Sequence, residues 1–332
     1  MLRTADDRAA SPQGVGAGCG VEVALSYPFR TGPPSGPPRP EDAFGETLRN
    51  GPPGTSLAEA LERHFPGAVP TRAYVGNETC ERLVPSPRAI EAWIAWAVPS
   101  GQEVTLVLPP LGGEAQESAL EGMRLLSEAP GAEVVANDWG TVHRLKTRYP
   151  GLRIVLGRLT HKMVRDPRIA EHFDSPRAPA AARAALCSSG ELAPGFRALM
   201  DRYGIGRREI DPYLQPLEEE EWEGRSEKLS VHLPYQFVTM GRACLPGSMH
   251  RERGEKFLPG GPCRWECRRY AVEFRVPSPG DGGEGRHLLN LGNGWYHAVP
   301  AAVLERVLAR LPASRQADRI VLTVPAPGSS PW

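Results

Sequence analysis

The stretch Glu133-Val134-Val135-Ala136-Asn137-Asp138-Trp139 contains the unit from which the fold is built. Its first four residues predict a short buried strand. Asp138 is a favoured N-cap residue, because its side-chain oxygen can accept a hydrogen bond from a backbone amide of the first turn, so a helix is expected from residue 139 to residue 149. The strand passes almost directly into the helix, which is the order found in parallel α/β proteins.

The same order of strand and helix recurs along the chain. Strands are predicted at 20–27, 72–75, 103–108, 133–136, 152–156, 208–211, 229–233, 270–276, 287–290 and 319–324. Helices are predicted at 56–65, 87–97, 117–128, 139–149, 194–203 and 300–311. The alternation predicts an α/β fold with parallel strands, in the form of a regular or irregular (β/α) TIM-barrel-like architecture. The segment 161–192 is rich in Arg, Ala and Pro and stays unassigned.

The chain is expected to form one barrel-like domain over residues 19–332, with a cysteine-rich loop region near its C-terminal third. Residues 1–18 are small and polar and are expected to form a disordered tail. Residues 31–55 are rich in Pro and Gly, which excludes a helix or a central strand and predicts a solvated insertion. The loop at 244–267 contains three of the six cysteines, and because thiolates are soft metal ligands it is expected to bind a cluster.

Charge and hydropathy exclude several classes of protein. The 39 Lys and Arg residues balance the 39 Asp and Glu residues, so nucleic-acid binding is not expected. No uninterrupted apolar run approaches the length of about 18 residues that a membrane span needs. The first 20 residues lack the apolar core of a signal peptide. We therefore expect a cytoplasmic protein, and in that reducing compartment clustered cysteines serve as metal ligands or redox groups.

Four of the six cysteines form a constellation at Cys80, Cys244, Cys263 and Cys267. Cys80 and Cys244 each follow a predicted strand. Thiolates are soft ligands that favour iron–sulfur clusters or zinc, so four of them could build a metal site. The alternative is that they are buried structural thiols, which is a common role of free cysteine. Cys19 and Cys187 are interpreted as ordinary thiols.

Polar residues at the carboxyl ends of predicted strands are candidates for binding a small-molecule substrate. They are Asn137, Asp138, Arg158 and Arg242. In (β/α) barrels the functional residues gather at these strand ends, and arginine suits a carboxylate ligand. The alternative for each residue is a helix cap or a surface ion pair.

Several short motifs resemble those of the collagenase-like peptidase U-thirty-two family, in particular its UbiV-like members, which act in oxygen-independent ubiquinone biosynthesis. The motifs are Tyr74-Val-Gly-Asn-Glu-Thr-Cys80-Glu-Arg, Val135-Ala-Asn-Asp138-Trp-Gly140, Leu233-Pro-Tyr with Gly-Arg242-Ala-Cys244, the pair Cys263/Cys267, and His287-Leu-Leu-Asn290. They extend over roughly residues 70–290. Residues 30–55 and 161–192 and the long spacer before Cys263 depart from the family pattern.

The resemblance implies a 4Fe-4S cluster bound by the four cysteines. It also implies a component of an oxygen-independent hydroxylation system that works with a UbiU-like partner in a hetero-oligomer. Peptidase activity is not expected, because the sequence has neither an H-E-x-x-H motif nor a G-x-S-x-G motif.

Two other functions stay open at this point. Other members of the family hydroxylate RNA, although the neutral net charge argues against an RNA substrate. A zinc-stabilised binding module without catalytic activity would use the same four cysteines as structural ligands.

Overall fold

The computed structural model describes residues 20–35, 57–173, 176–215, 226–259, 261–276 and 286–324. The predicted tail at 1–18, Cys19 and most of the predicted insertion at 31–55 lie outside the described residues. No helix of the described part is long and apolar enough to cross a membrane.

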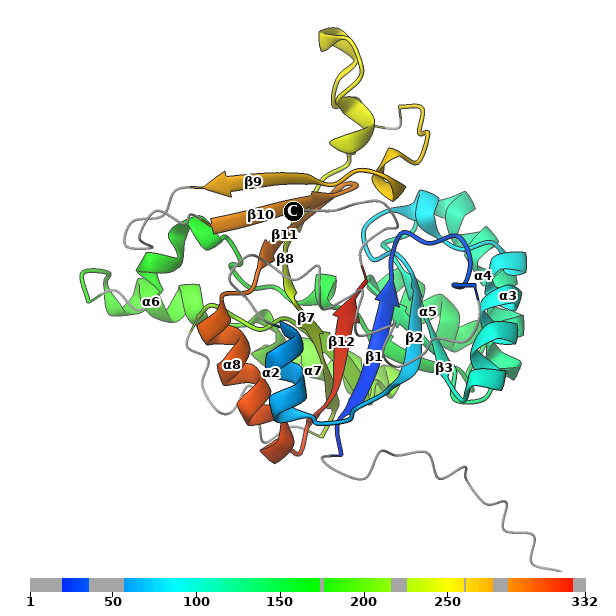
Figure 1. Cartoon of the computed structure of the whole chain (residues 1–332), viewed down its shortest axis with the longest axis horizontal. Coiled ribbons are helices and arrows are strands. Elements are labelled where there is room, and N and C mark those ends of the chain that lie inside the picture. Colours follow the sequence, from blue (N-terminus) through cyan, green and yellow to red (C-terminus); the bar gives the residue numbers. More distant parts are fainter. Residues whose placement is uncertain are drawn as a thin grey trace, which may run out of the picture.

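The described chain contains a closed barrel of eight parallel strands, so the predicted (β/α) architecture is confirmed. Each strand pairs in parallel with its two neighbours, and helices cover the outside of the barrel (Figure 1). In order around the barrel the strands are β1 (Glu22–Tyr27), β12 (Ala317–Thr323), β7 (Lys228–Leu233), β6 (Arg207–Ile210), β5 (Arg153–Leu156), β4 (Glu133–Ala136), β3 (Glu103–Leu108) and β2 (Pro70–Gly76).

Two helices begin at the caps that the sequence signals, whereas α4 begins at Gly113, four residues before its predicted start. Ser86 caps α3 through a hydrogen bond from the Ala89 amide, and Asp138 caps α5 through one from the Thr141 amide. The described helices are α2 (Leu57–His64), α3 (Pro87–Ala97), α4 (Gly113–Glu128), α5 (Trp139–Arg148), α6 (Ala180–Cys187), α7 (Pro194–Tyr203) and α8 (Ala301–Arg310). The segment left unassigned by the sequence contains α6 and two short 3-10 helices, Pro167–His172 and Gly190–Leu192.

The main apolar core lies between the barrel and its helices. The inside of the barrel combines buried charged and polar side chains with a smaller apolar cluster, formed by Ala24, Tyr74, Val107, Val135, Val155 and Val321. At the amino end of the strands, buried Arg319 pairs with Glu22 at 2.6 Å and with Glu133 at 2.7 Å. Arg72 pairs with Glu22 at 2.7 Å and also with Glu103. Because a buried charge is costly unless it is paired, these contacts are needed to close the barrel around charged side chains.

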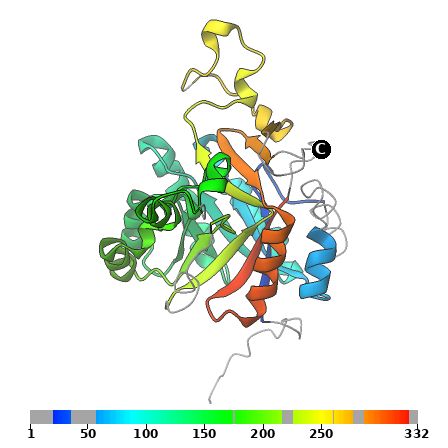
Figure 2. The ribbon, with the colours of Figure 1, turned by 90° about the vertical axis from the view of Figure 1, so that its left-hand side faces the viewer.

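A second sheet of four antiparallel strands lies at the carboxyl end of the barrel strands, as Figures 1 and 2 show. Its order is β8 (Tyr235–Met240), β11 (Gly294–Ala298), β10 (Arg286–Leu291) and β9 (Val272–Val276). We call it the small sheet. The sequence predicted the strands at 270–276 and 287–290 within the alternating series, and it missed β8 and β11. Local periodicity predicts that a segment is extended, but it does not identify the partner strand.

Replacing Arg319 with Ala should destabilise the fold by about 3–5 kcal/mol, because the substitution leaves Glu133 buried without its main partner. Urea unfolding followed by circular dichroism measures this loss. Arg124 is the matched control, since its pair with Glu128 is exposed and its replacement with Ala should cost less than about 0.5 kcal/mol. Equal losses for the two variants would contradict the proposed role of the ion pairs inside the barrel.

Stability should also fall as the pH decreases from about 5 to about 2. Burial by itself would raise the pKa of Glu133, but Arg319 and Arg72 lower that pKa to about 2. A carboxyl group with a lowered pKa in the folded chain stabilises the fold above its unfolded pKa, and this contribution is lost as the pH falls through the folded pKa. The variant Glu133→Gln should show a flatter dependence of unfolding free energy on pH. If the unfolding free energy of Glu133→Gln depends on pH as strongly as that of the natural chain, other carboxyl groups cause the acid sensitivity.

Candidate functional site: a four-cysteine cavity

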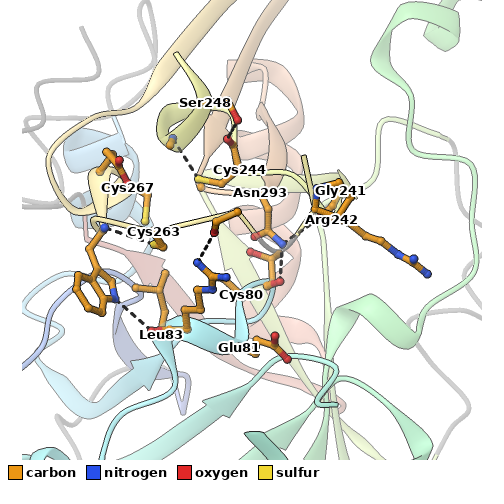
Figure 3. Close-up of a pocket in the computed structure, with 18 of the residues that line it drawn as sticks. Cys80, Glu81, Leu83, Gly241, Arg242, Cys244, Ser248, Cys263, Cys267 and Asn293 are labelled. Carbon is orange, nitrogen blue, oxygen red and sulfur yellow. Dashed lines mark hydrogen bonds between the residues drawn. The ribbon is translucent and has the colours of Figure 1, made fainter. Parts of the chain in front are cut away.

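A cavity of about 330 Å³ brings the four predicted cysteines together at the edge of the small sheet (Figure 3). Cys80 lies after β2, Cys244 lies after β8, and Cys263 and Cys267 precede β9. Cys267 is buried, and the other three side chains are partly exposed. The cavity therefore collects thiols from three segments of the chain. Cys187 does not line it: this residue ends α6, and its thiol contacts the carbonyl of Phe173.

Two asparagine side chains hold the Cys80 segment in place. The side-chain oxygen of Asn77, Oδ1, accepts hydrogen bonds from the Thr79 and Cys80 backbone amides, both at 2.9 Å. Asn293, in the turn between β10 and β11, donates to the carbonyl of Thr79 at 2.8 Å and to that of Gly241 at 3.0 Å. Asn293 thus links the segment after β2 to the segment after β8, although these segments are far apart in sequence.

The thiols lie close enough to affect one another's protonation. A hydrogen bond with Cys267, together with one from the Gly247 amide at 3.4 Å, lowers the pKa of Cys244 to about 7. The same hydrogen bond raises the pKa of Cys267, which burial and the charges of the other three thiols raise further. Burial raises the pKa of Cys80. Among Cys80, Cys244 and Cys267, Cys244 is therefore the thiol that ionises most readily.

The donor set suits a soft metal centre, because all four side chains are thiols. Backbone amides point at two of the sulfurs: Gly247 donates to Cys244, and Trp265 donates to Cys263, each at 3.4 Å. Hydrogen bonds of this kind to cysteine sulfurs are used in iron–sulfur proteins to tune the cluster. Among the described residues, however, no group of three or more Cys, His, Asp and Glu side chains is arranged to hold a metal ion as it stands.

Arg158 is buried at the carboxyl mouth of the barrel and is surrounded by protein groups. Its guanidinium contacts both carboxylate oxygens of Glu78, at 2.6 and 2.8 Å, and Asp211 at 2.6 Å. It also donates to the carbonyl of Tyr235 in the small sheet at 2.9 Å. Burial alone would raise the pKa of Glu78, but Arg158 holds it below its ordinary value. Arg158 therefore has a structural role as the ion-pair partner of two buried carboxylates.

The other three polar candidates do not gather around the thiols as one group. Asn137 is buried, donates to the carbonyl of Leu108 at 2.8 Å and accepts from the Leu159 amide at 3.2 Å. Asp138 is the N-cap of α5. Arg242 is exposed and lines the thiol cavity, but Figure 3 shows its side chain extending away from the cysteines.

A second and much smaller cavity, of about 30 Å³, lies inside the barrel mouth. Its polar lining includes Glu78, Arg158, His232 and Tyr296, and the Tyr296 hydroxyl donates to Glu78 at 2.9 Å. Glu78 lines this cavity and its neighbour Thr79 lines the thiol cavity, so the segment that leads to Cys80 borders both cavities. The space suffices for one or two water molecules.

Sequence reasoning missed several residues that shape the two cavities. Glu78 lies inside the quoted motif before Cys80, and Asp211 directly follows β6, so position at a strand end could have identified both. The dipeptide Asn293-Gly294 is a known hairpin signal and could have revealed β11. The contact of Asn293 with Thr79 has no signal in the local sequence.

No protein-family model matches this sequence, and no curated protein matches it significantly.

Replacing Asp138 with Ala should lower the stability by about 1 kcal/mol, through loss of the cap on α5. Ser86→Ala is the matched control, because Ser86 caps α3 in the same way. Thermal unfolding should show similar losses for the two variants. A loss of more than about 2 kcal/mol in Asp138→Ala alone would contradict a role as a helix cap only.

Proposed function

We propose that the chain binds a 4Fe-4S cluster through Cys80, Cys244, Cys263 and Cys267. We further propose that it acts in an oxygen-independent hydroxylation system on a small-molecule substrate, together with a UbiU-like partner protein. The single observation that carries the proposal is the convergence of these four thiols, and not of Cys187, on one cavity.

The choice of a cluster over zinc rests on the resemblance of the motifs around Cys80, Asp138 and Cys244, because an all-thiolate donor set suits either group. The four thiols line a cavity of about 330 Å³, which has room for either group. When bound, a 4Fe-4S cluster supplies a redox centre whose potential depends on hydrogen bonds and on solvent exposure.

Residues beside the thiols are suited to support a negatively charged thiolate set. The positive charge of Arg82 favours the thiolate form of Cys80, and that of Arg251 favours the thiolate form of Cys244. Arg82 also donates to the carbonyl of Gly261 at 2.8 Å, and Arg251 donates to that of Pro262. These two arginines therefore stabilise charge in the cavity and also fasten the backbone that leads to Cys263.

The hydroxylation system and the partner are proposed from the family resemblance of the motifs around Cys80, Asp138 and Cys244. Disruption of the gene in the source organism, grown without oxygen, should lower the content of hydroxylated quinone. An unchanged quinone content would overturn this part of the proposal and leave the cluster itself to be decided by metal analysis.

Protein purified without oxygen should be brown and should contain about four irons and four sulfides per chain. Cys263→Ala should lose much of the iron, because it removes one of the four thiols. Cys187→Ala is the control and should keep the iron, because this cysteine lies outside the cavity. Metal analysis and the visible absorption spectrum measure both effects.

Stoichiometric zinc without a visible absorption band, after strictly anaerobic purification, would contradict the iron–sulfur proposal. It would favour the zinc-stabilised binding module in its place. Equal iron loss in the Cys263 and Cys187 variants would instead show that iron is bound without a specific site.

A further inference from the structure

Exposed apolar side chains concentrate around the thiol cavity. The described chain has nine large hydrophobic or aromatic side chains that are well exposed, and seven of them lie between residues 240 and 274. These seven are Met240, Met249, Phe257, Leu258, Trp265, Tyr270 and Phe274. Exposed apolar residues that are scattered singly need no explanation, whereas a group of them on one feature marks a contact site.

Three of these side chains lie on a segment that projects from the molecule. Residues 246–259, which we call the arm, extend away from both the barrel and the small sheet in Figures 1 and 2. Met249, Phe257 and Leu258 on the arm are 57%, 54% and 54% exposed. The arm therefore presents apolar surface to solvent, and Leu258 also lines the thiol cavity.

The backbone of this region is held in an uncommon conformation. Phe257 and Trp265 have φ values of 60° and 56°, and they are the two non-glycine residues with positive φ among those that the structure describes. Such conformations cost free energy and cluster at functional sites. The Ser248 hydroxyl fixes the base of the arm by donating to the carbonyl of Cys244 at 2.7 Å and accepting from the Phe257 amide at 3.3 Å.

The same region is basic in a chain that is neutral as a whole. Residues 240–276 contain seven Arg and one Lys against four Glu, an excess of four positive charges. Arg253, Arg264 and Arg269 are exposed. Oppositely charged surfaces attract one another and accelerate encounter, so this face is complementary to an acidic partner.

We propose that the arm and the basic, apolar rim of the thiol cavity form a docking site for a small acidic electron-transfer protein. The docking rests on the surface just described, and the electron delivery rests on the proposed cluster. On docking, the partner is oxidised by one electron and the cluster is reduced by one, with no covalent bond formed or broken. Three of the four cysteines are partly exposed, so a partner seated on the rim comes close to the thiols.

The chemistry of the surface favours a protein partner over RNA or a second copy of the chain. The exposed rings of Phe257, Trp265, Tyr270 and Phe274 suit base stacking as well as protein contact, so they do not separate the two kinds of partner. Four glutamates are interspersed among the basic residues, which breaks up the continuous positive stripe that a phosphate backbone needs. A symmetric contact between two copies would place two positively charged surfaces against each other. Electron-transfer complexes bury little area and depend on charge steering, which fits an exposed rim of this kind.

The test uses the full chain and a plant-type [2Fe-2S] ferredoxin as the acidic probe. Binding is measured by fluorescence anisotropy of the labelled ferredoxin, with the metal content of the chain recorded alongside. We expect binding at low salt that weakens strongly toward about 0.5 M salt. The triple variant R253E/R264E/R269E should weaken binding at least about tenfold. The control R148E/R197E/R202E makes the same change of charge on α5 and α7 and should bind like the natural chain.

A second variant distinguishes a specific site from general ionic attraction. M249S/L258S keeps every charge and should also weaken the binding of the ferredoxin several-fold. If only the charge reversals weaken binding, or if no ferredoxin binds, the proposed docking site is wrong. If a single-stranded oligouridine binds more tightly than the ferredoxin, and the charge-reversal and apolar variants both lose that binding, the site is an RNA-binding site instead. If sedimentation shows that the chain associates with itself through the arm, the partner is a second copy of the chain instead.

The same samples separate this inference from the proposed function. Ferredoxin binding to a chain that lacks iron would support the docking site and contradict the cluster. A cluster that dithionite reduces, in a chain that does not bind the ferredoxin, would support the cluster and overturn the docking site.

Discussion

The contact of Arg158 with Glu78 and Asp211 is the interaction on which the candidate site depends. The three side chains come from the ends of three different barrel strands, and Arg158 also holds the small sheet through the carbonyl of Tyr235. Glu78 lies two residues before Cys80 and also accepts a hydrogen bond from Tyr296 of the small sheet. Because breaking a buried ion pair leaves a charge uncompensated, this contact fixes the small sheet over the barrel mouth. It thereby sets the position of Cys80 relative to the other three thiols.

Charge is compensated at both ends of the barrel, but with different consequences. At the amino end, Arg72 and Arg319 each form ion pairs with both Glu22 and Glu133. These side chains occupy the barrel at this end and close it. At the carboxyl end, the compensated charges leave two cavities, one among buried polar groups and one among thiols. The arrangement agrees with the general division of such barrels into a stabilising end and a functional end.

Much of the barrel could be predicted because its signals are local. Alternating polarity located β1, buried runs located β3 and β4, and Ser86 and Asp138 marked the starts of α3 and α5. The strand-end rule also anticipated that Cys80 and Cys244 would lie near each other. The strand-end rule could not show whether Arg158 binds substrate or pairs with buried carboxylates. Both kinds of residue lie at the carboxyl ends of barrel strands. The pairing of β8 with β11 and the role of Asn293 escaped prediction because they depend on contacts between segments more than 50 residues apart in sequence. The hairpin of β10 and β11, by contrast, had a local signal at Asn293-Gly294.

The distribution of the thiols along the chain also orders events in time. Cys80 belongs to a strand end near the start of the barrel, whereas Cys244, Cys263 and Cys267 are synthesised after seven of the eight barrel strands. The chain is synthesised from its amino terminus, so more than 160 residues are added after Cys80 before the next of the other three thiols is made. The cavity exists only after the small sheet has settled on the barrel. An inorganic group held by all four thiols therefore has its complete ligand set only once the barrel and the small sheet have come together.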